Sequence, residues 1–466
     1  MWRLVTSVTE RPNPAVLTEA ARPHDLVRMI VVLGSIIAIA PLTIDMYLPA
    51  LPSIADDLMT DSTSVQLTLT GTLLGLAVGQ VFIGPLSDAL GRRRPLIAGL
   101  ATHVIASLLC VVAPNIAVLG GLRVLQGLGT AAATVVATAV VRDLFSGLAA
   151  AKAFSRLMLV MGAAPILAPT LGSQVLRWTE WRGVFVALAV LGVAVAVVAI
   201  MALPETLPRE RRVRGGVAAT IRSYGSIASD RTFVGLILVA SLSMAALFAY
   251  VSGSSFVLQQ QYGLSVQQFG LVFGAGAAGL IAATQFNVRL LNRYSPRQIL
   301  VGALAVGSVA SLILLGSAAT SFGGLVGILL PLWTVLASAG LALPNAPALA
   351  LTRHGEAAGT AAALLGAAQF GVGAIAAPLV GALGGTSLAM AVIIAAGLLG
   401  ALAALVFVVR PADLDVEPAV EPIAGLTVQP IRPTIGPTDG PAVEPIAGPA
   451  GAAVADPTAE PAVAPA

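Results

Sequence analysis

About a dozen apolar runs, each long enough to cross a bilayer, follow one another between Val27 and Val409. A membrane-spanning helix needs roughly 20 mostly apolar residues. The chain is 57% hydrophobic and only 10% charged, unlike a soluble globular protein. We therefore predict an all-α membrane protein with twelve transmembrane helices. The expected spans are 27–49, 66–87, 95–113, 116–140, 154–176, 183–203, 232–256, 267–288, 299–319, 322–343, 358–382 and 386–409.

The arginines predict which loops face the cytoplasm. They gather in alternate loops, such as Arg92 to Arg94 and Arg209 to Arg214, whereas Asp56, Asp57 and Asp61 lie in a loop of the other set. Cytoplasmic loops of membrane proteins carry an excess of Lys and Arg. An even number of spans with this bias places both termini in the cytoplasm.

The order of segments predicts two six-helix bundles. Six spans, a basic central loop and six more spans follow one another, and the interval from Gln80 to Arg92 recurs from Gln285 to Arg297. Parallel repeats of this kind are typical of some transporters, although chance similarity among Ala- and Gly-rich helices is an open alternative. The expected parts are a cytoplasmic tail at 1–25, a bundle at 26–205, a cytoplasmic loop at 206–230, a second bundle at 231–409 and a Pro/Ala-rich disordered tail at 410–466.

Charged groups inside the spans are the first candidates for function. Asp45 lies in the first span and Arg123 in the fourth, and a charged side chain at the centre of a membrane helix costs about 2.5–3.5 kcal/mol on insertion scales. A carboxyl group that alternates between protonated and charged forms would suit a proton-coupled carrier. Asp45 could instead be a structural carboxylate, and Arg123 could be a static ion-pair partner; both alternatives stay open.

The loop from Gly84 to Arg94 is a second candidate, with a conformational role. Asp88 could pair with Arg92 or Arg93, with Asp143 as a further partner, and so hold one side of the protein closed. An orientation anchor alone is the simpler alternative. The residues expected to act in conformational change are Gly84, Asp88, Gly91, Arg92, Arg93, Asp143, Pro165, Pro169 and Gly172.

Four passages resemble one family. They are Ile44-Asp-Met-Tyr-Leu-Pro-Ala-Leu-Pro, the Gly84–Arg94 loop, Arg123-Val-Leu-Gln-Gly and Gly162-Ala-Ala-Pro-Ile-Leu-Ala-Pro-Thr-Leu-Gly. Together they resemble the major facilitator superfamily and, within it, the bicyclomycin/chloramphenicol-resistance (Bcr/CflA) branch of drug:proton antiporters. Two departures are Ala89, where the loop usually has arginine, and Ser173, where the last motif usually has a second glycine.

The resemblance implies a proton-coupled exporter of small amphipathic organic molecules in the cytoplasmic membrane. It also implies that Arg123 serves proton and substrate coupling, that the protein needs no cofactor besides the proton gradient, and that a monomer functions. A narrow-specificity metabolite exporter of the same fold is the main alternative. The substrate-binding candidates are Tyr47, Gln126, Tyr250, Phe256, Asn345 and Gln369.

Enzyme classes find little support in the sequence. No phosphate-binding Gly-x-x-x-x-Gly-Lys-[Ser/Thr] motif occurs. Asp56, Asp57 and Asp61 are similar to the Mg²⁺-binding aspartates of membrane prenyltransferases, but no second acidic cluster accompanies them. We therefore expect no enzymatic activity, no metal and no nucleic-acid partner.

Overall fold

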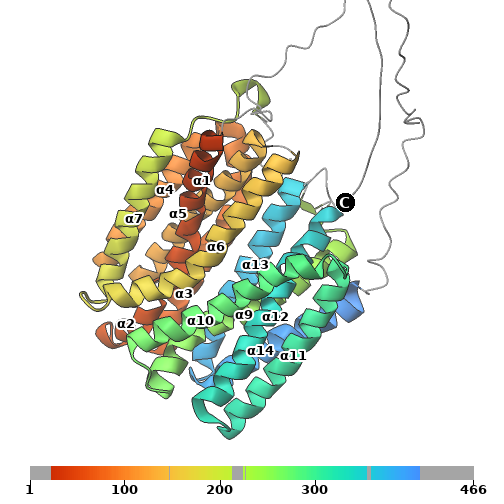
Figure 1. Cartoon of the computed structure of the whole chain (residues 1–466). Helices are drawn as coiled ribbons and strands as arrows, with labels where there is room; N and C mark the ends of the chain where they lie inside the picture. Colours follow the sequence, from red (N-terminus) through yellow and green to blue (C-terminus); the bar gives the residue numbers. More distant parts are fainter. Residues whose placement is uncertain (1–22, 146, 213–223, 226, 354–357, 410–466) are drawn as a thin grey trace, which may run out of the picture. The chain divides into compact units, whose positions relative to one another are not determined.

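The computed structural model describes residues 23–145, 147–212, 224–225, 227–353 and 358–409. All regular structure in these residues is helical, and the long helices run side by side (Figure 1). Most of the predicted tail at 1–25, all of the predicted tail at 410–466, and residues 213–223 and 226 of the central loop at 206–230 lie outside the described residues, so those predictions stay open.

The elements fall into two halves along the chain. The first half holds α1 (Pro23–Asp45), η1 (Leu48–Ala50), α2 (Leu51–Asp57), α3 (Ser62–Leu90), α4 (Arg93–Val111), α5 (Ile116–Leu144), α6 (Gly147–Val175) and α7 (Trp181–Ala202). After η2 (Arg209–Arg211), the second half holds α9 (Arg231–Phe256), η3 (Val257–Gln261), α10 (Val266–Leu290), α11 (Pro296–Thr320), α12 (Gly324–Thr352), α13 (Ala358–Ala382), α14 (Ser387–Ala403) and η5 (Ala404–Val409).

The predicted spans follow the same order along the chain as these helices, but two points differ. Eleven helical segments of the described residues are long and apolar enough to cross a membrane. The long helix α6 is not among them, and several of its side chains lie outside the described part, so twelve spans stay a prediction. The first span is also not one helix to residue 49, because α1 ends at Asp45 and two short helices follow. Pro49 and Pro52 each occupy the first turn of one of these short helices, where a missing N–H costs no hydrogen bond.

Small residues bring the helices of the first half close together. A Cβ atom added to Gly71 or Gly75 of α3 would collide with the backbone carbonyl of Gly120 or Val124 in α5. Membrane helices associate through such small-residue faces because lipid offers no hydrophobic drive for packing. Gly71 and Gly75 of α3 therefore form a packing face against α5.

Prolines inside three helices create contacts with other parts of the chain. A proline has no N–H, so the carbonyl four residues before it loses its helical donor. In α3, α12 and α13 that carbonyl accepts a side-chain hydroxyl from a neighbouring segment instead, as the membrane interior requires. The proline, carbonyl and donor sets are Pro85, Val81 and Tyr224 at 3.0 Å, Pro344, Gly340 and Thr284 at 2.9 Å, and Pro378, Ala374 and Thr70 at 2.9 Å.

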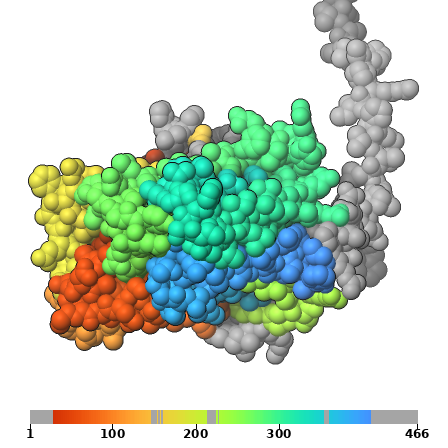
Figure 2. Space-filling view, turned by 90° about the horizontal axis from the view of Figure 1, so that it is seen from below, coloured from red at the N-terminus to blue at the C-terminus, as the bar shows by residue number. Residues whose placement is uncertain are grey.

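The two halves touch at the end of the molecule that carries Asp57 and Glu180, here called the acidic end. Gln66 of α3 is fully buried there, where its Nε2 donates to the carbonyl of Ser252 and its Oε1 accepts from the N–H of Gly381 at 2.8 Å. Ser255 and Gln259 donate to the carbonyls of Leu48 and Pro49. Figure 2 shows residues of the first half, in red to yellow, against those of the second half, in green to blue. Side chain to backbone hydrogen bonds thus join the halves at the acidic end.

Candidate functional site

Arg123 of α5 is the largest fully buried side chain of the described residues. Its Nη1 donates to Oε1 of Gln126, one helical turn away, and its Nη2 donates to the carbonyl of Thr43 in α1 at 3.1 Å. Its guanidinium lies 4.0 Å from the centroid of the Tyr47 ring. A cation over an aromatic face is attracted by the ring quadrupole, more strongly in a desolvated site. The partners of this buried charge are therefore all neutral.

A chain of hydrogen bonds extends from Arg123 into α4. Gln126 donates through Nε2 to Ser107 Oγ at 2.7 Å, and Ser107 donates to the carbonyl of His103. Nδ1 of His103 lies 3.3 Å from the hydroxyl of Thr130, which is itself bonded to the carbonyl of Gln126. His103 thus packs as a member of this buried network, as expected for a core histidine. The network links α1, α4 and α5 across the first half.

Asp45 is the buried carboxylate of the first half. It is the last residue of α1, at the break between that helix and η1, and it is 6% exposed. Among the described residues it forms no hydrogen bond or ion pair. The pairing of Asp45 with Arg123 that the sequence suggests is therefore absent from this conformation, because the guanidinium is occupied by Gln126, the Thr43 carbonyl and the Tyr47 ring.

The six substrate candidates do not line one open surface. Tyr47, Gln126, Tyr250, Phe256 and Asn345 are all buried, and Gln369 alone is half-buried. Tyr250 stacks on Phe273, with ring centroids 5.0 Å apart and an interplanar angle of 15°. Asn345 donates to Asn287 Oδ1 at 2.8 Å, which joins α12 to α10. The structure brings Tyr47 and Gln126 together around Arg123 and leaves the other four in the second half.

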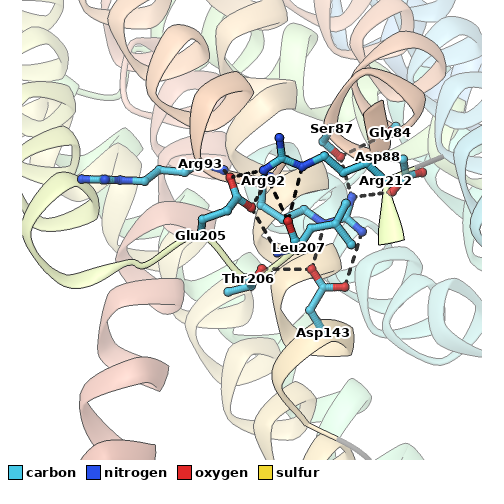
Figure 3. A network of polar contacts seen from close by, with 10 residues as sticks. All are labelled: Gly84, Ser87, Asp88, Arg92, Arg93, Asp143, Glu205, Thr206, Leu207 and Arg212. Carbon is cyan, nitrogen blue, oxygen red and sulfur yellow. Dashed lines mark hydrogen bonds and ion pairs between the residues drawn. The ribbon is translucent and has the colours of Figure 1, made fainter. Parts of the chain in front are cut away.

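The predicted ion pairs of the Gly84–Arg94 loop are present (Figure 3). Arg92 is 7% exposed and pairs with Asp88 at 2.5 Å and with Asp143, at the end of α5, at 2.8 Å. Burial alone would lower the pKa of Arg92, but the hydrogen bonds to Asp143 and Asp88 outweigh it and raise the pKa above its ordinary value. Gly91 has φ +91°, which a side chain rarely tolerates, so the tight turn depends on glycine here.

Glu205, just after α7, is a member of this network that the sequence analysis missed. Its carboxylate accepts from the backbone N–H groups of Arg92 at 2.8 Å and Arg93 at 3.3 Å, which are free donors at the start of α4. Arg212 lies 3.7 Å from the same carboxylate, and the next residue, Thr206, donates to Asp143 at 3.0 Å. The signal in the sequence is the Pro-Glu-Thr-Leu stretch that closes α7, whose partner could not be read from the sequence.

The remaining conformational candidates lie in three different places. Gly84 sits one residue before Pro85 in α3, and Arg93 donates through Nη2 to the carbonyl of Ile200 in α7 at 2.7 Å. Pro165 and Pro169 lie inside α6, which is helical throughout. A Cβ atom on Gly172 would collide with the carbonyl of Met46, so the backbones of α6 and of the segment after α1 are in close contact there.

The chain is similar in sequence and in fold to known membrane transporters. The model of the Major Facilitator Superfamily matches residues 33–378, about three quarters of the chain. The chain belongs to this superfamily.

Its relatives place it in the bicyclomycin/chloramphenicol-resistance branch. It is 36% identical over 351 residues to an uncharacterized MFS-type transporter, YdgK, of Bacillus subtilis, which covers 75% of this chain and 87% of the relative. It is 31% identical over 358 residues to a bicyclomycin resistance protein homolog of Haemophilus influenzae, covering 75% and 88%. The xylose transporter XylE of Escherichia coli, in a partially occluded inward-open conformation, superposes with a TM-score of 0.66 at 12% identity over 83% of this chain and 98% of that one.

Proposed function

We propose that the protein exports small amphipathic organic molecules through the cytoplasmic membrane in exchange for protons. Family membership and a relative named for bicyclomycin resistance support drug efflux. The proposal includes alternating access by two six-helix bundles, with both termini in the cytoplasm, no cofactor and function as a monomer. The electrical part of the gradient supplies about 2.3 kcal/mol per charge and 100 mV, and a tenfold concentration ratio requires about 1.4 kcal/mol.

The observation that carries proton coupling is the isolation of Asp45. A buried carboxylate without a partner is costly when charged, and protonation removes that cost. It lies at the end of α1, where residues 48–50 contact the second half through Ser255 and Gln259. A change in these contacts would change the access of water to the carboxyl group, which is the requirement for a proton carrier. Arg123, held by neutral partners nearby, is the proposed second coupling residue.

The substrate site is proposed at the facing surfaces of the halves. Tyr250, Asn345 and Gln369 offer aromatic and amide groups among apolar side chains, which suits molecules with a large apolar part and few polar groups. No acidic side chain occurs within the spans of the second half, so strongly cationic substrates are disfavoured. In this conformation the candidates are mostly buried, and the proposal requires that rocking of the halves exposes them.

The test is transport in liposomes with an imposed pH difference. Purified protein should drive a bicyclomycin- or chloramphenicol-type compound against its gradient only when the pH difference has the correct direction. Asp45→Asn should abolish this coupled transport while expression and thermal stability stay intact. Asp56→Asn, an exposed carboxylate 11 residues further along the chain, is the matched control and should transport normally.

Transport that ignores the pH difference, or full coupling in Asp45→Asn, would refute proton exchange at this residue. A drug-susceptibility panel in an efflux-deficient host, combined with metabolite profiling of the medium, separates a broad drug exporter from a narrow metabolite exporter.

A further inference from the structure

A cavity of about 480 Å³ lies beside the Gly84–Arg94 loop, between the start of α4 and the segment that follows α7. We call this cavity the arginine pocket. Four arginines line it, Arg93, Arg94, Arg209 and Arg212, together with Glu205 and the apolar side chain of Ile97. Arg93 donates to the carbonyl of Ile200, and Arg212 pairs with Glu205 and donates to the carbonyl of Leu207. These contacts leave Arg94 and Arg209 without a described role.

The charges of the arginine pocket are not balanced within the described residues. Glu205 is its one carboxylate, and that group already accepts the backbone N–H groups of Arg92 and Arg93 and pairs with Arg212 at 3.7 Å. Arg94 and Arg209 are exposed, and their side chains form no hydrogen bond or ion pair with another described residue. Nε of Arg93 is buried and has no partner among those residues either. The pocket therefore presents guanidinium donors to an anion.

The position of the pocket indicates which anion. It lies where α4 begins and α7 ends, and both helices are candidate membrane spans. Ile97 lies in the first turns of α4, and Ile200 and Met201 at the end of α7 are 45% and 78% exposed. The arginines thus lie at the ends of two candidate membrane spans, with apolar side chains on the side towards the spans. Lipid headgroups are expected at this position beside a membrane-spanning helix. A soluble phosphate compound needs only the arginines, whereas a phospholipid needs the arginines for its headgroup and the apolar side chains for its acyl chains.

We propose that the arginine pocket binds the phosphodiester headgroup of an anionic phospholipid, whose acyl chains lie along Ile97 and the end of α7. Guanidinium groups bind phosphate oxygens through paired, charge-assisted hydrogen bonds. Basic pockets between transmembrane helices are a recognised form of anionic headgroup site. The proposal does not depend on proton exchange or on the nature of the exported compound.

The experiment measures lipid retention by native mass spectrometry. The full chain is incubated in detergent with equimolar phosphatidylglycerol and phosphatidylcholine. The wild type should retain phosphatidylglycerol selectively. The double variant Arg94→Gln/Arg209→Gln removes two charges and leaves the contacts of Glu205 in place. Each surface arginine contributes about 1 kcal/mol to anionic lipid binding, so the double variant should bind phosphatidylglycerol about 30-fold more weakly.

The matched control is Arg289→Gln/Arg293→Gln, which removes two exposed arginines, one from the last turn of α10 and one from the loop that follows it. It should retain phosphatidylglycerol like the wild type, and thermal midpoints in phosphatidylcholine should agree among all three proteins. If the double variant cannot be purified, each single variant is measured and should show about a fivefold loss.

Three results would overturn the proposal. One is equal weakening in the pocket and control variants, which indicates general surface charge. Another is equal retention of the two lipids by the wild type. The third is displacement of phosphatidylglycerol by millimolar glycerol phosphate as readily as by the lipid itself, which would assign the pocket to a soluble phosphate compound.

Discussion

The hydrogen bond from Thr70 to the carbonyl of Ala374 gives a sharp test of how the halves are held together. Pro378 deprives this carbonyl of its helical N–H donor, and the Thr70 hydroxyl replaces it at 2.9 Å from the other half. Thr70→Val keeps the shape of the side chain and removes the donor. In membrane proteins such side-chain hydrogen bonds average about 0.6 kcal/mol, with a maximum of about 1.7. The variant should therefore shift the balance towards states open at the acidic end by about three- to twentyfold.

Distances between spin labels report this balance. Engineered cysteines at Val112 and Phe322, exposed positions in loops of the first and second halves, carry the labels, while the native Cys110 is fully buried. Thr70→Val should increase the fraction of long distances in the distribution. Thr72→Val is the matched control, because the Thr72 hydroxyl bonds to the carbonyl of Thr68 within its own helix.

A double-mutant cycle with Pro378→Ala decides whether the loss of a hydrogen-bond donor to the Ala374 carbonyl causes the shift seen in Thr70→Val. Alanine restores an N–H group at position 378, so Ala374 regains its donor within α13 and Thr70→Val should then have almost no effect. An equal shift caused by Thr70→Val with proline and with alanine at 378 would refute this reasoning. It would indicate that the valine changes packing rather than hydrogen bonding.

Three further predictions concern the end of the molecule opposite the acidic end, which carries the Gly84–Arg94 loop. Tyr224→Phe removes the hydroxyl from the carbonyl freed in α3 and should destabilise the protein by about 1 kcal/mol in thermal unfolding, because a partly buried acceptor loses its donor. Asp143→Asn removes one of the two carboxylates around buried Arg92 and should cost about 2 kcal/mol, with reduced transport in liposomes. Partial burial would raise the pKa of Asp230, but its hydrogen bond from Arg353 helps to hold that pKa below the usual value. A depressed folded-state pKa stabilises the fold above the unfolded value of about 3.9, so the thermal advantage over Asp230→Asn should be present at pH 6. It should be lost as the pH falls below the unfolded value and through the lower folded-state pKa.

The long spans were predictable because membrane helices satisfy two simple requirements, length and apolar composition. Both can be counted along the chain. The break after Asp45 was not predicted, because Pro49 and Pro52 stand in an apolar run that a count of hydrophobic residues treats as continuous. Prolines four residues after a carbonyl could have marked Val81 and Ala374 as freed acceptors. Which hydroxyl would satisfy each of them depends on tertiary packing and cannot be read from one sequence.

The ion pairs and hydrogen bonds of the Gly84–Arg94 loop were likewise predictable only in part. The spacing of Asp88 and Arg92, one helical turn apart, predicts a local pair, and that pair is present. Glu205 lies 113 residues from Arg92, and only the fold brings its carboxylate to the start of α4. Local electrostatics can thus be anticipated from sequence, whereas a capping group supplied by a distant segment of the chain cannot.

Asp45 and Arg123, two buried charged residues inside predicted spans of the first half, show that the partners of a buried charge decide whether a nearby group can change its protonation state. If Asp45 were the ion-pair partner of Arg123, protonation of the carboxylate would leave a buried cation unpaired, at a cost of about 3–5 kcal/mol. Arg123 is instead held by the amide oxygen of Gln126, the Thr43 carbonyl and the face of Tyr47. These partners are neutral, so the protonation state of Asp45 can change without removing any of them. The arrangement therefore permits a proton to come and go at Asp45 while the surrounding helices stay folded, which is a physical requirement of the proposed exchange.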